Sequence, residues 1–150
     1  MLMAPQSDHR GRPEDAFLME AGYALSGDHG CIAQARHHAV DFLGTVRSEH
    51  GLDVSPRAVD LTQLIVSELV TNARKYAPGP VLMELRVTRA AVEVMVWDSE
   101  PTVPTPRAAD PHRVGQHGLE IVEAVAQSLD ITRHAVGKRI TARLALPDRR

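Results

Sequence analysis

Two apolar segments, residues 81–88 and 91–97, are separated only by Arg89 and Ala90, and a long helix-like segment precedes them. The first mixes apolar and polar residues in the manner of a half-buried strand. The second alternates less cleanly, which is typical of a strand buried on both faces. Strands of this kind need a covering layer, so the pattern predicts a strand pair beneath helices.

Helices are predicted both before and after this strand pair in the sequence. Residues 31–49 carry apolar side chains at helical spacing, and Asp28 is placed to cap that helix. A second helix begins at Ser55 and Pro56, where a capping side chain precedes a proline at the first helical position. A third helix is predicted over residues 118–129.

Three more strands are predicted, over residues 16–25, 130–136 and 138–146. Together the elements predict an α/β (α+β) two-layer sandwich, with a helical layer over a mixed β-sheet. A chain of 150 residues with 43% hydrophobic composition can fill the core of one such domain. We assign the domain to residues 15–147, between a flexible tail at 1–14 and a short tail at 148–150.

Composition excludes several classes of function. A formal net charge of −2 argues against a nucleic-acid binder that works through its whole surface. The single cysteine, Cys31, rules out an internal disulfide and fits a reducing cytoplasm. No apolar run is long enough to span a membrane, and residues 1–13 lack the apolar segment of a secretory signal. We therefore expect a cytoplasmic protein that contacts neither membrane nor nucleic acid directly.

The helix that begins at Pro56 carries two polar side chains among its apolar residues. Glu68 and Asn72 are four residues apart and therefore project from one face as neighbours. A solvent-facing polar pair is the ordinary explanation of such spacing. Two later features favour a functional explanation instead. Asp98 ends the buried strand, and Gly115-Gln116-His117-Gly118 leads directly into a helix.

Each of these groups has a use if the ligand is a nucleoside triphosphate with Mg²⁺. Magnesium prefers oxygen ligands and often shares phosphate oxygens, and Asn72 can offer it a neutral carbonyl oxygen. Glu68 can polarise a hydroxyl or a water beside the γ-phosphate. Gly115 and Gly118 allow backbone N–H groups to approach phosphates at a helix start. Asp98 can accept a hydrogen bond from the adenine amino group.

Three segments together carry a resemblance to a known family, namely SELVTNARKYA at 67–77, VWD at 96–98 and GQHGLEIV at 115–122. The set resembles the ATP-binding superfamily of gyrase B, the heat-shock chaperones, the histidine kinases and the MutL repair proteins. Within it, the chain looks most like the bacterial anti-sigma-factor serine kinases. The resemblance covers about residues 15–147 and implies a helical layer over a mixed sheet.

The resemblance also implies roles for single residues. Glu68 would be the general base, Asn72 the magnesium ligand and Asp98 the carboxylate that recognises adenine. The backbone that cradles the phosphates would run through Gly115, Gln116, His117, Gly118 and Leu119, within a lid loop over residues 99–117. Lys75 would reach phosphate, with a solvated side chain as the alternative.

The sequence departs from the family pattern at two places, both close to where the nucleotide would bind. The segment after Asp98 reads Ser-Glu-Pro-Thr and lacks the glycines that much of the superfamily carries there. Lys138 and Arg139 stand where relatives commonly carry a threonine beside the adenine. Thr141, nearby on the same predicted strand, is the remaining candidate for that contact.

The resemblance implies a bacterial anti-sigma factor that is also an Mg-ATP-dependent serine/threonine-protein kinase. Its partners would be a sigma factor, which it sequesters, and an antagonist protein, which it phosphorylates. Family likeness also suggests a homodimer. The alternative is a non-catalytic module that uses nucleotide to order its lid and sequesters a transcription regulator. Glu68 weighs against that alternative, because binding alone needs no base. In a third interpretation, the three segments that carry the resemblance are relics and no nucleotide binds.

Overall fold

The computed structural model describes residues 16–26, 28, 30–76, 80–98, 114–135 and 137–147. The tails predicted at 1–14 and 148–150 lie outside these residues, as do lid residues 99–113. The elements in chain order are β1 (Met19–Leu25), α1 (Cys31–His50), α2 (Pro56–Tyr76), β2 (Val81–Val87), β3 (Ala91–Asp98), α3 (Val114–Val125), β4 (Ser128–His134) and β5 (Gly137–Ala145).

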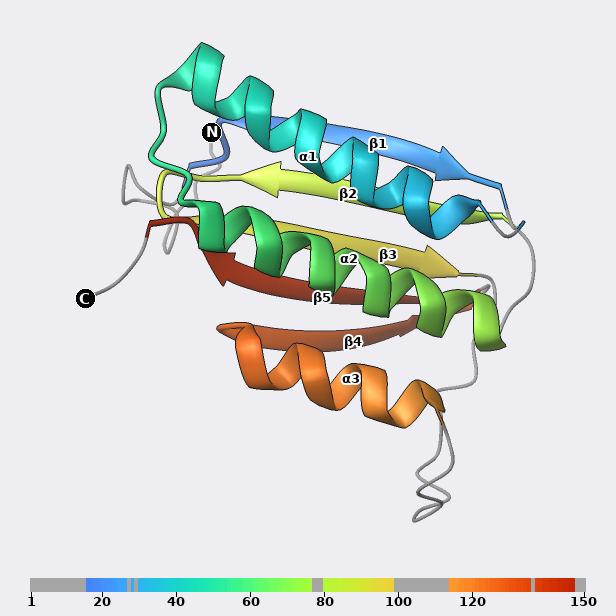
Figure 1. Ribbon diagram of the computed structural model, residues 1–150. Coiled ribbons are helices and arrows are strands. Elements are labelled where there is room, and N and C mark those ends of the chain that lie inside the picture. The colour runs from blue at the N-terminus through green and yellow to red at the C-terminus, as the bar shows by residue number, and fades with distance from the viewer. Residues whose placement is uncertain are drawn as a thin grey trace, which may run out of the picture.

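The described elements form two layers, with the helices on one side of a five-stranded sheet (Figure 1). Helix α1 covers β1 and β2, α2 covers β3 and β5, and α3 lies by β4 and against α2. The two-layer α+β sandwich predicted from the sequence is therefore confirmed. None of the helices in the described ranges is both long and apolar enough to cross a membrane.

The sheet is antiparallel at each of its described strand pairs, so the prediction of a mixed sheet is wrong. The strand order is β1-β2-β3-β5-β4. The connection from β3 through α3 brings the chain back to a strand, β4, that runs in the same direction as β3. These two strands are not neighbours, because β5 lies between them and is antiparallel to both. β3 and β4 therefore run in the same direction but do not pair with each other.

The core between the layers is aliphatic, as the scarcity of aromatic residues predicts. On β3 and β5 the helix-facing side chains form cross-strand pairs such as Val94 with Ala142 and Val96 with Ile140. Above them, α2 contributes buried residues that include Ile65, Val66, Leu69 and Val70. Full burial of one such side chain stabilises the fold by roughly 1.5–3 kcal/mol. The position of α2 is therefore firmly set.

The start of α2 confirms the predicted cap. Ser55 Oγ accepts a hydrogen bond of 3.0 Å from the backbone N–H of Ala58. The same hydroxyl donates to the carbonyl oxygen of Leu146 at 3.5 Å, which ties the helix start to the end of the sheet. The predicted cap of α1 is wrong. Asp28 lies too far upstream, and its carboxylate instead accepts from the N–H of Gly30, which is the N-cap residue.

Helix α3 spans Val114–Val125, so the predicted boundaries of 118–129 are wrong at both ends. Gly115 and Gly118 favoured a loop in the sequence because glycine inside a helix costs about 1 kcal/mol relative to alanine. At the other end, Leu129 belongs to β4, where it pairs with Ala142 of β5. The apolar residue that seemed to continue the helical pattern belongs to the sheet.

Replacing Ser55 by alanine tests the cap. Ser55→Ala removes the acceptor for the Ala58 N–H, and such a change costs about 1 kcal/mol of unfolding free energy. Urea denaturation should show that loss. The matched control is Ser48→Ala, in which an exposed hydroxyl that donates to Thr45 O is removed from the end of α1. We expect the control to remain within about 0.5 kcal/mol of the parent, and equal losses in both variants would contradict the capping role.

Candidate functional site

Four chain segments meet at one end of the sandwich. The last turns of α2, the end of β3, the start of β5 and the start of α3 all lie at the right-hand end in Figure 1. Among the predicted site residues that come from these segments, Glu68 and Asn72 lie on α2 and Asp98 lies on β3. Residues far apart in the sequence are thus gathered at the same end of the molecule.

Asn72 is a buried polar residue on the inner side of α2. Only 1% of its surface is exposed, so a solvent-facing polar pair does not describe this helix. No described residue donates a hydrogen bond to its Oδ1 atom, although the residue takes part in another interaction. Glu68, one turn earlier, is half-buried. Neither side chain occupies the position of an ordinary surface group.

The carboxylate of Glu68 lies directly against Gly118 of α3. A Cβ atom added at Gly118 would stand 2.8 Å from Glu68 Oε1, which is closer than real Cβ contacts allow. A side chain at this position would therefore require the end of the flexible Glu68 side chain to shift. The sequence predicted Gly118 as a phosphate contact, and its relation to Glu68 becomes visible only when α2 and α3 are packed together.

The predicted phosphate-cradling residues have a helical backbone in this structure. Gly115, Gln116 and His117 lie in the first turns of α3, and their side chains are outside the described part of the chain. Gly118 is buried, and Leu119 is half-buried against the core. Their backbone contact to phosphate stays a prediction.

One predicted contact, Thr141, lies away from the other site residues. Thr141 pairs with Met95 across the sheet, whereas Asp98 pairs with Lys138. Because side chains alternate along a strand, Thr141 faces the side of the sheet opposite to Asp98. The structure therefore does not bring Thr141 beside Asp98. Lys75 is exposed in the last turn of α2.

Asp98 is held by an ion pair that the sequence analysis missed. Lys138 Nζ donates to Asp98 Oδ2 over 2.8 Å, and the two side chains are 0% and 2% exposed. The sequence showed a lysine where a threonine is common, but only the strand register places it opposite Asp98. Removing one partner of such a pair costs about 3–5 kcal/mol, because the other charge stays buried. Asp98→Asn would therefore disturb folding as well as binding.

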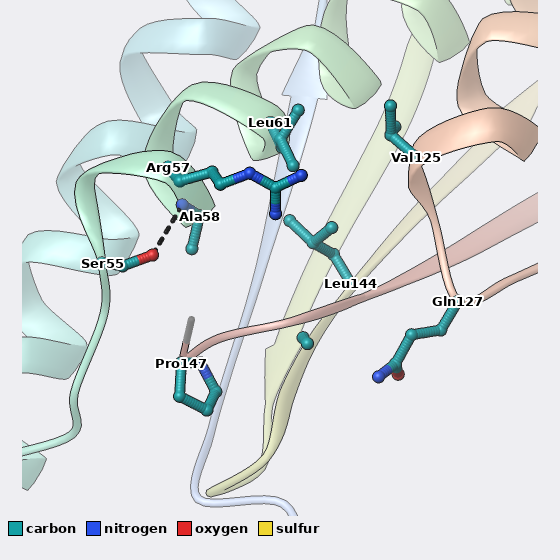
Figure 2. Close-up of a pocket in the computed structure, with 9 residues that line it drawn as sticks. Ser55, Arg57, Ala58, Leu61, Val125, Gln127, Leu144 and Pro147 are labelled. Carbon is teal, nitrogen blue, oxygen red and sulfur yellow. Dashed lines mark hydrogen bonds between the residues drawn. The ribbon is translucent and has the colours of Figure 1, made fainter. Parts of the chain in front are cut away.

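A hollow of about 380 Å³ lies at the other end of α2 (Figure 2). Apolar side chains, among them Leu61, Val125 and Leu144, form much of its wall. Arg57 extends across it, and Ser55 stands at its edge beside Ala58. It contains none of the predicted site residues, so it is separate from the site at the far end of the helix.

A model of the histidine kinase-like ATPase domain matches residues 31–144. The chain belongs to this family. The match spans α1 to β5 and includes Glu68, Asn72, Asp98 and Gly118. Membership supports ATP binding by the chain, while the assignment of single residues to the nucleotide stays a prediction.

Among solved structures, one match is the crystal structure of the RsbU and RsbW domains of Rv1364c from Mycobacterium tuberculosis. It has a TM-score of 0.63 and 16% sequence identity, and the match covers 87% of this chain and 33% of that one. This ATPase domain thus spans about a third of the length of the solved chain, and at this identity the likeness shows the fold alone. No curated protein sequence matches significantly.

The family implies Mg²⁺ along with ATP, and the donors at this end of the ATPase domain fit that ion. Magnesium takes oxygen ligands and usually needs only one or two from the protein, because phosphates and waters supply the rest. The side-chain carbonyl oxygen of Asn72 and the carboxylate of Glu68 are ligands of this type. No group of three or more His, Cys, Asp or Glu side chains that could hold a metal occurs in the described ranges.

Gly118→Ala tests the contact between α3 and Glu68. Alanine normally stabilises a helix interior by about 1 kcal/mol over glycine. Here the new methyl group must displace the Glu68 carboxylate, so we expect a smaller gain or a small loss of unfolding free energy. The matched control is Gly44→Ala in α1, where an added Cβ meets nothing within 4 Å and the full gain should appear.

The same contact predicts non-additive effects. In the Glu68→Ala background the carboxylate is gone, so Gly118→Ala should recover the gain seen at Gly44. Urea denaturation of the two single variants and the double variant measures this coupling. Residues in contact typically show an interaction free energy of at least about 0.5 kcal/mol. Additive effects would show that Glu68 and Gly118 do not touch.

Proposed function

We propose that this ATPase domain binds Mg-ATP at the end of the sandwich that holds Glu68, Asn72 and Asp98, and that it is a protein kinase. The observation that carries the proposal is the half-buried Glu68 carboxylate, placed against Gly118 and one turn from the buried Asn72. Family membership supports ATP as the nucleotide. The resemblance of residues 67–77 to the anti-sigma-factor serine kinases supplies the protein substrate.

In this proposal the nucleotide is held by groups from three elements. Asn72 Oδ1 is the protein ligand of Mg²⁺, which when bound neutralises charge on the phosphate oxygens. The backbone N–H groups of the first turn of α3, which have no partner within the helix, face the phosphates, where a helix start favours anions. Asp98 accepts a hydrogen bond from the base. Lys75 is exposed and lies on the last turn of α2, within the same end of the molecule.

Glu68 is the general base of the transfer step. Its carboxylate takes the proton from a serine or threonine hydroxyl of the antagonist protein, and the hydroxyl oxygen forms a bond to the γ-phosphorus. The bond between that phosphorus and the oxygen that bridges to the β-phosphate breaks, and ADP leaves. Contact with α3 at Gly118 limits where the Glu68 carboxylate can lie, which favours one orientation for proton transfer.

The biological role that follows is a switch between two partners. The ATPase domain sequesters a sigma factor, and phosphorylation of the antagonist decides which partner it holds. The alternative, a nucleotide-gated binding module without transfer, uses the same pocket. Glu68 separates the two, because a binding module has no use for a base held against Gly118.

Asn72→Ala tests the magnesium ligand. We expect at least a tenfold loss of Mg-ATP affinity, about 1.4 kcal/mol, because the neutral oxygen ligand is removed. Calorimetric titration with Mg-ATP, and with ATP in excess EDTA, measures it. Only the affinity for Mg-ATP should fall, and the affinity for ATP in excess EDTA should not change.

The matched control for Asn72→Ala is Thr62→Val, two to three turns earlier on α2. Thr62 is fully buried, and its hydroxyl has no hydrogen-bond partner among the described residues. Its replacement should leave Mg-ATP binding unchanged. If Asn72→Ala binds Mg-ATP as the parent does while both variants stay folded, the assignment of the metal ligand is wrong.

Glu68→Gln tests the general base. The amide keeps the shape of the side chain but does not accept the hydroxyl proton, so ATP affinity should stay within about twofold of the parent while turnover falls about 10²–10⁴-fold. Single-turnover ADP formation, with water as the acceptor, gives the rate without a partner protein. The matched control is Glu123→Gln, an exposed glutamate on α3 that should change neither quantity. Equal turnover in parent and Glu68→Gln would remove Glu68 from the mechanism.

A further inference from the structure

Lys138 and Asp98 form the last cross-strand pair where β3 ends, and both are buried. The distance from Lys138 Nζ to Asp98 Oδ2 is 2.8 Å, with side-chain exposures of 0% and 2%. The next pair along the same face is Val96 with Ile140, which is wholly apolar. The charged pair therefore stands where the apolar core ends, at the same end as Asn72 and Glu68.

Burying this ion pair costs desolvation free energy that an apolar contact between the two strands would not. Both ions lose their hydration, and in measured cases well-packed apolar residues hold such a position equally well or better. The strands are already joined by their backbone ladder, and Val96 with Ile140 shows that the same face accepts apolar residues. A buried ion pair at the same end of the sandwich as the proposed nucleotide site is therefore a candidate for a role in specificity.

The chemistry of the two groups is complementary to the edge of adenine. A carboxylate only accepts hydrogen bonds, and an ammonium only donates them through three N–H bonds. Together they present an acceptor and a donor side by side. The Watson–Crick edge of adenine carries a donor, the N6 amino group, next to an acceptor, N1. Guanine in the same orientation carries O6 and N1–H there, so both contacts would be mismatched.

We propose that Lys138 is a second base-reading residue, which donates a hydrogen bond to adenine N1 while Asp98 accepts one from the N6 amino group. The inference rests on the proposed function, since it concerns the same nucleotide site. The ion pair stays intact when the base binds, because a carboxylate has about four acceptor positions and an ammonium three donors. Lys138 thus takes part in selecting the base, and its ion pair also holds the Asp98 carboxylate in place.

The test compares ATP with 1-deaza-ATP, in which a C–H group replaces N1 and the N6 amino group remains. Calorimetric titration of the parent should show binding of 1-deaza-ATP weaker by about tenfold, because a hydrogen bond to a charged donor is lost. In Lys138→Met the two nucleotides should bind with affinities within about twofold of each other, since the donor is gone. A purely structural role for Lys138 would lower both affinities together and leave their ratio unchanged.

The matched control is Arg139→Met, which removes the neighbouring cation. Arg139 lies on the opposite face of β5, with its guanidinium 5.2 Å from the centre of the Trp97 ring. This variant should keep the parent's preference for ATP over 1-deaza-ATP.

Each outcome separates this inference from the proposed function. If the parent binds ATP and 1-deaza-ATP equally well, Lys138 does not read N1, while ATP binding itself stands. If Lys138→Met is folded and still discriminates, another group reads N1 and the inference is overturned. The parent's ratio needs no variant, so equal binding of the two nucleotides overturns the inference even if Lys138→Met does not fold. Absence of ATP binding by the parent would overturn both proposals.

Discussion

The packing of α2 on β3 and β5 is the contact on which the rest of the structure depends. Ile65, Val66 and Leu69 are fully buried there, and they fix the rotation of the helix about its axis. One residue of slippage would turn the helix by about 100°. Asn72 would then leave the interior, and Glu68 would leave Gly118. The apolar face of α2 thus determines where its two polar site residues lie.

At one end of the sandwich, buried polar groups replace the aliphatic contacts between α2 and the sheet. Along most of the interface the sheet presents aliphatic pairs, but at its end it presents Asp98 with Lys138, and α2 presents Asn72. Burial of such groups costs free energy unless they are paired or bind a ligand. At the opposite end of α2, by contrast, Ser55 satisfies the backbone N–H of Ala58 and the helix start is closed. Among the described residues, the buried charged pair and Asn72 lie where function is proposed, whereas the buried hydroxyls of Ser55, Thr62 and Thr88 lie elsewhere.

The sequence predicted what is encoded locally and missed what depends on packing. The start of α2 was predictable because Ser55 and Pro56 act on adjacent backbone groups, and the neighbour relation of Glu68 and Asn72 follows from helical spacing alone. The start of α3 was missed because Gly118 resembles a loop residue until the Glu68 carboxylate is beside it. The mixed sheet failed for a related reason, since it depends on strand order. The placement of Thr141 on the face opposite to Asp98 likewise depends on register.

Under the proposed function, binding and transfer depend on different elements. Asn72 and Asp98 lie on α2 and β3, which pack against each other through the core, and they serve binding. The Glu68 carboxylate also lies on α2, but its free space is limited by α3 at Gly118. A shift of α3 relative to α2 therefore alters both the space around the Glu68 carboxylate and the proposed phosphate contacts at the start of α3, while Asn72 and Asp98 keep their positions. Changes in α3 should accordingly act on turnover and on phosphate binding together, whereas changes at the ends of β3 and β5 should act on the choice of nucleotide.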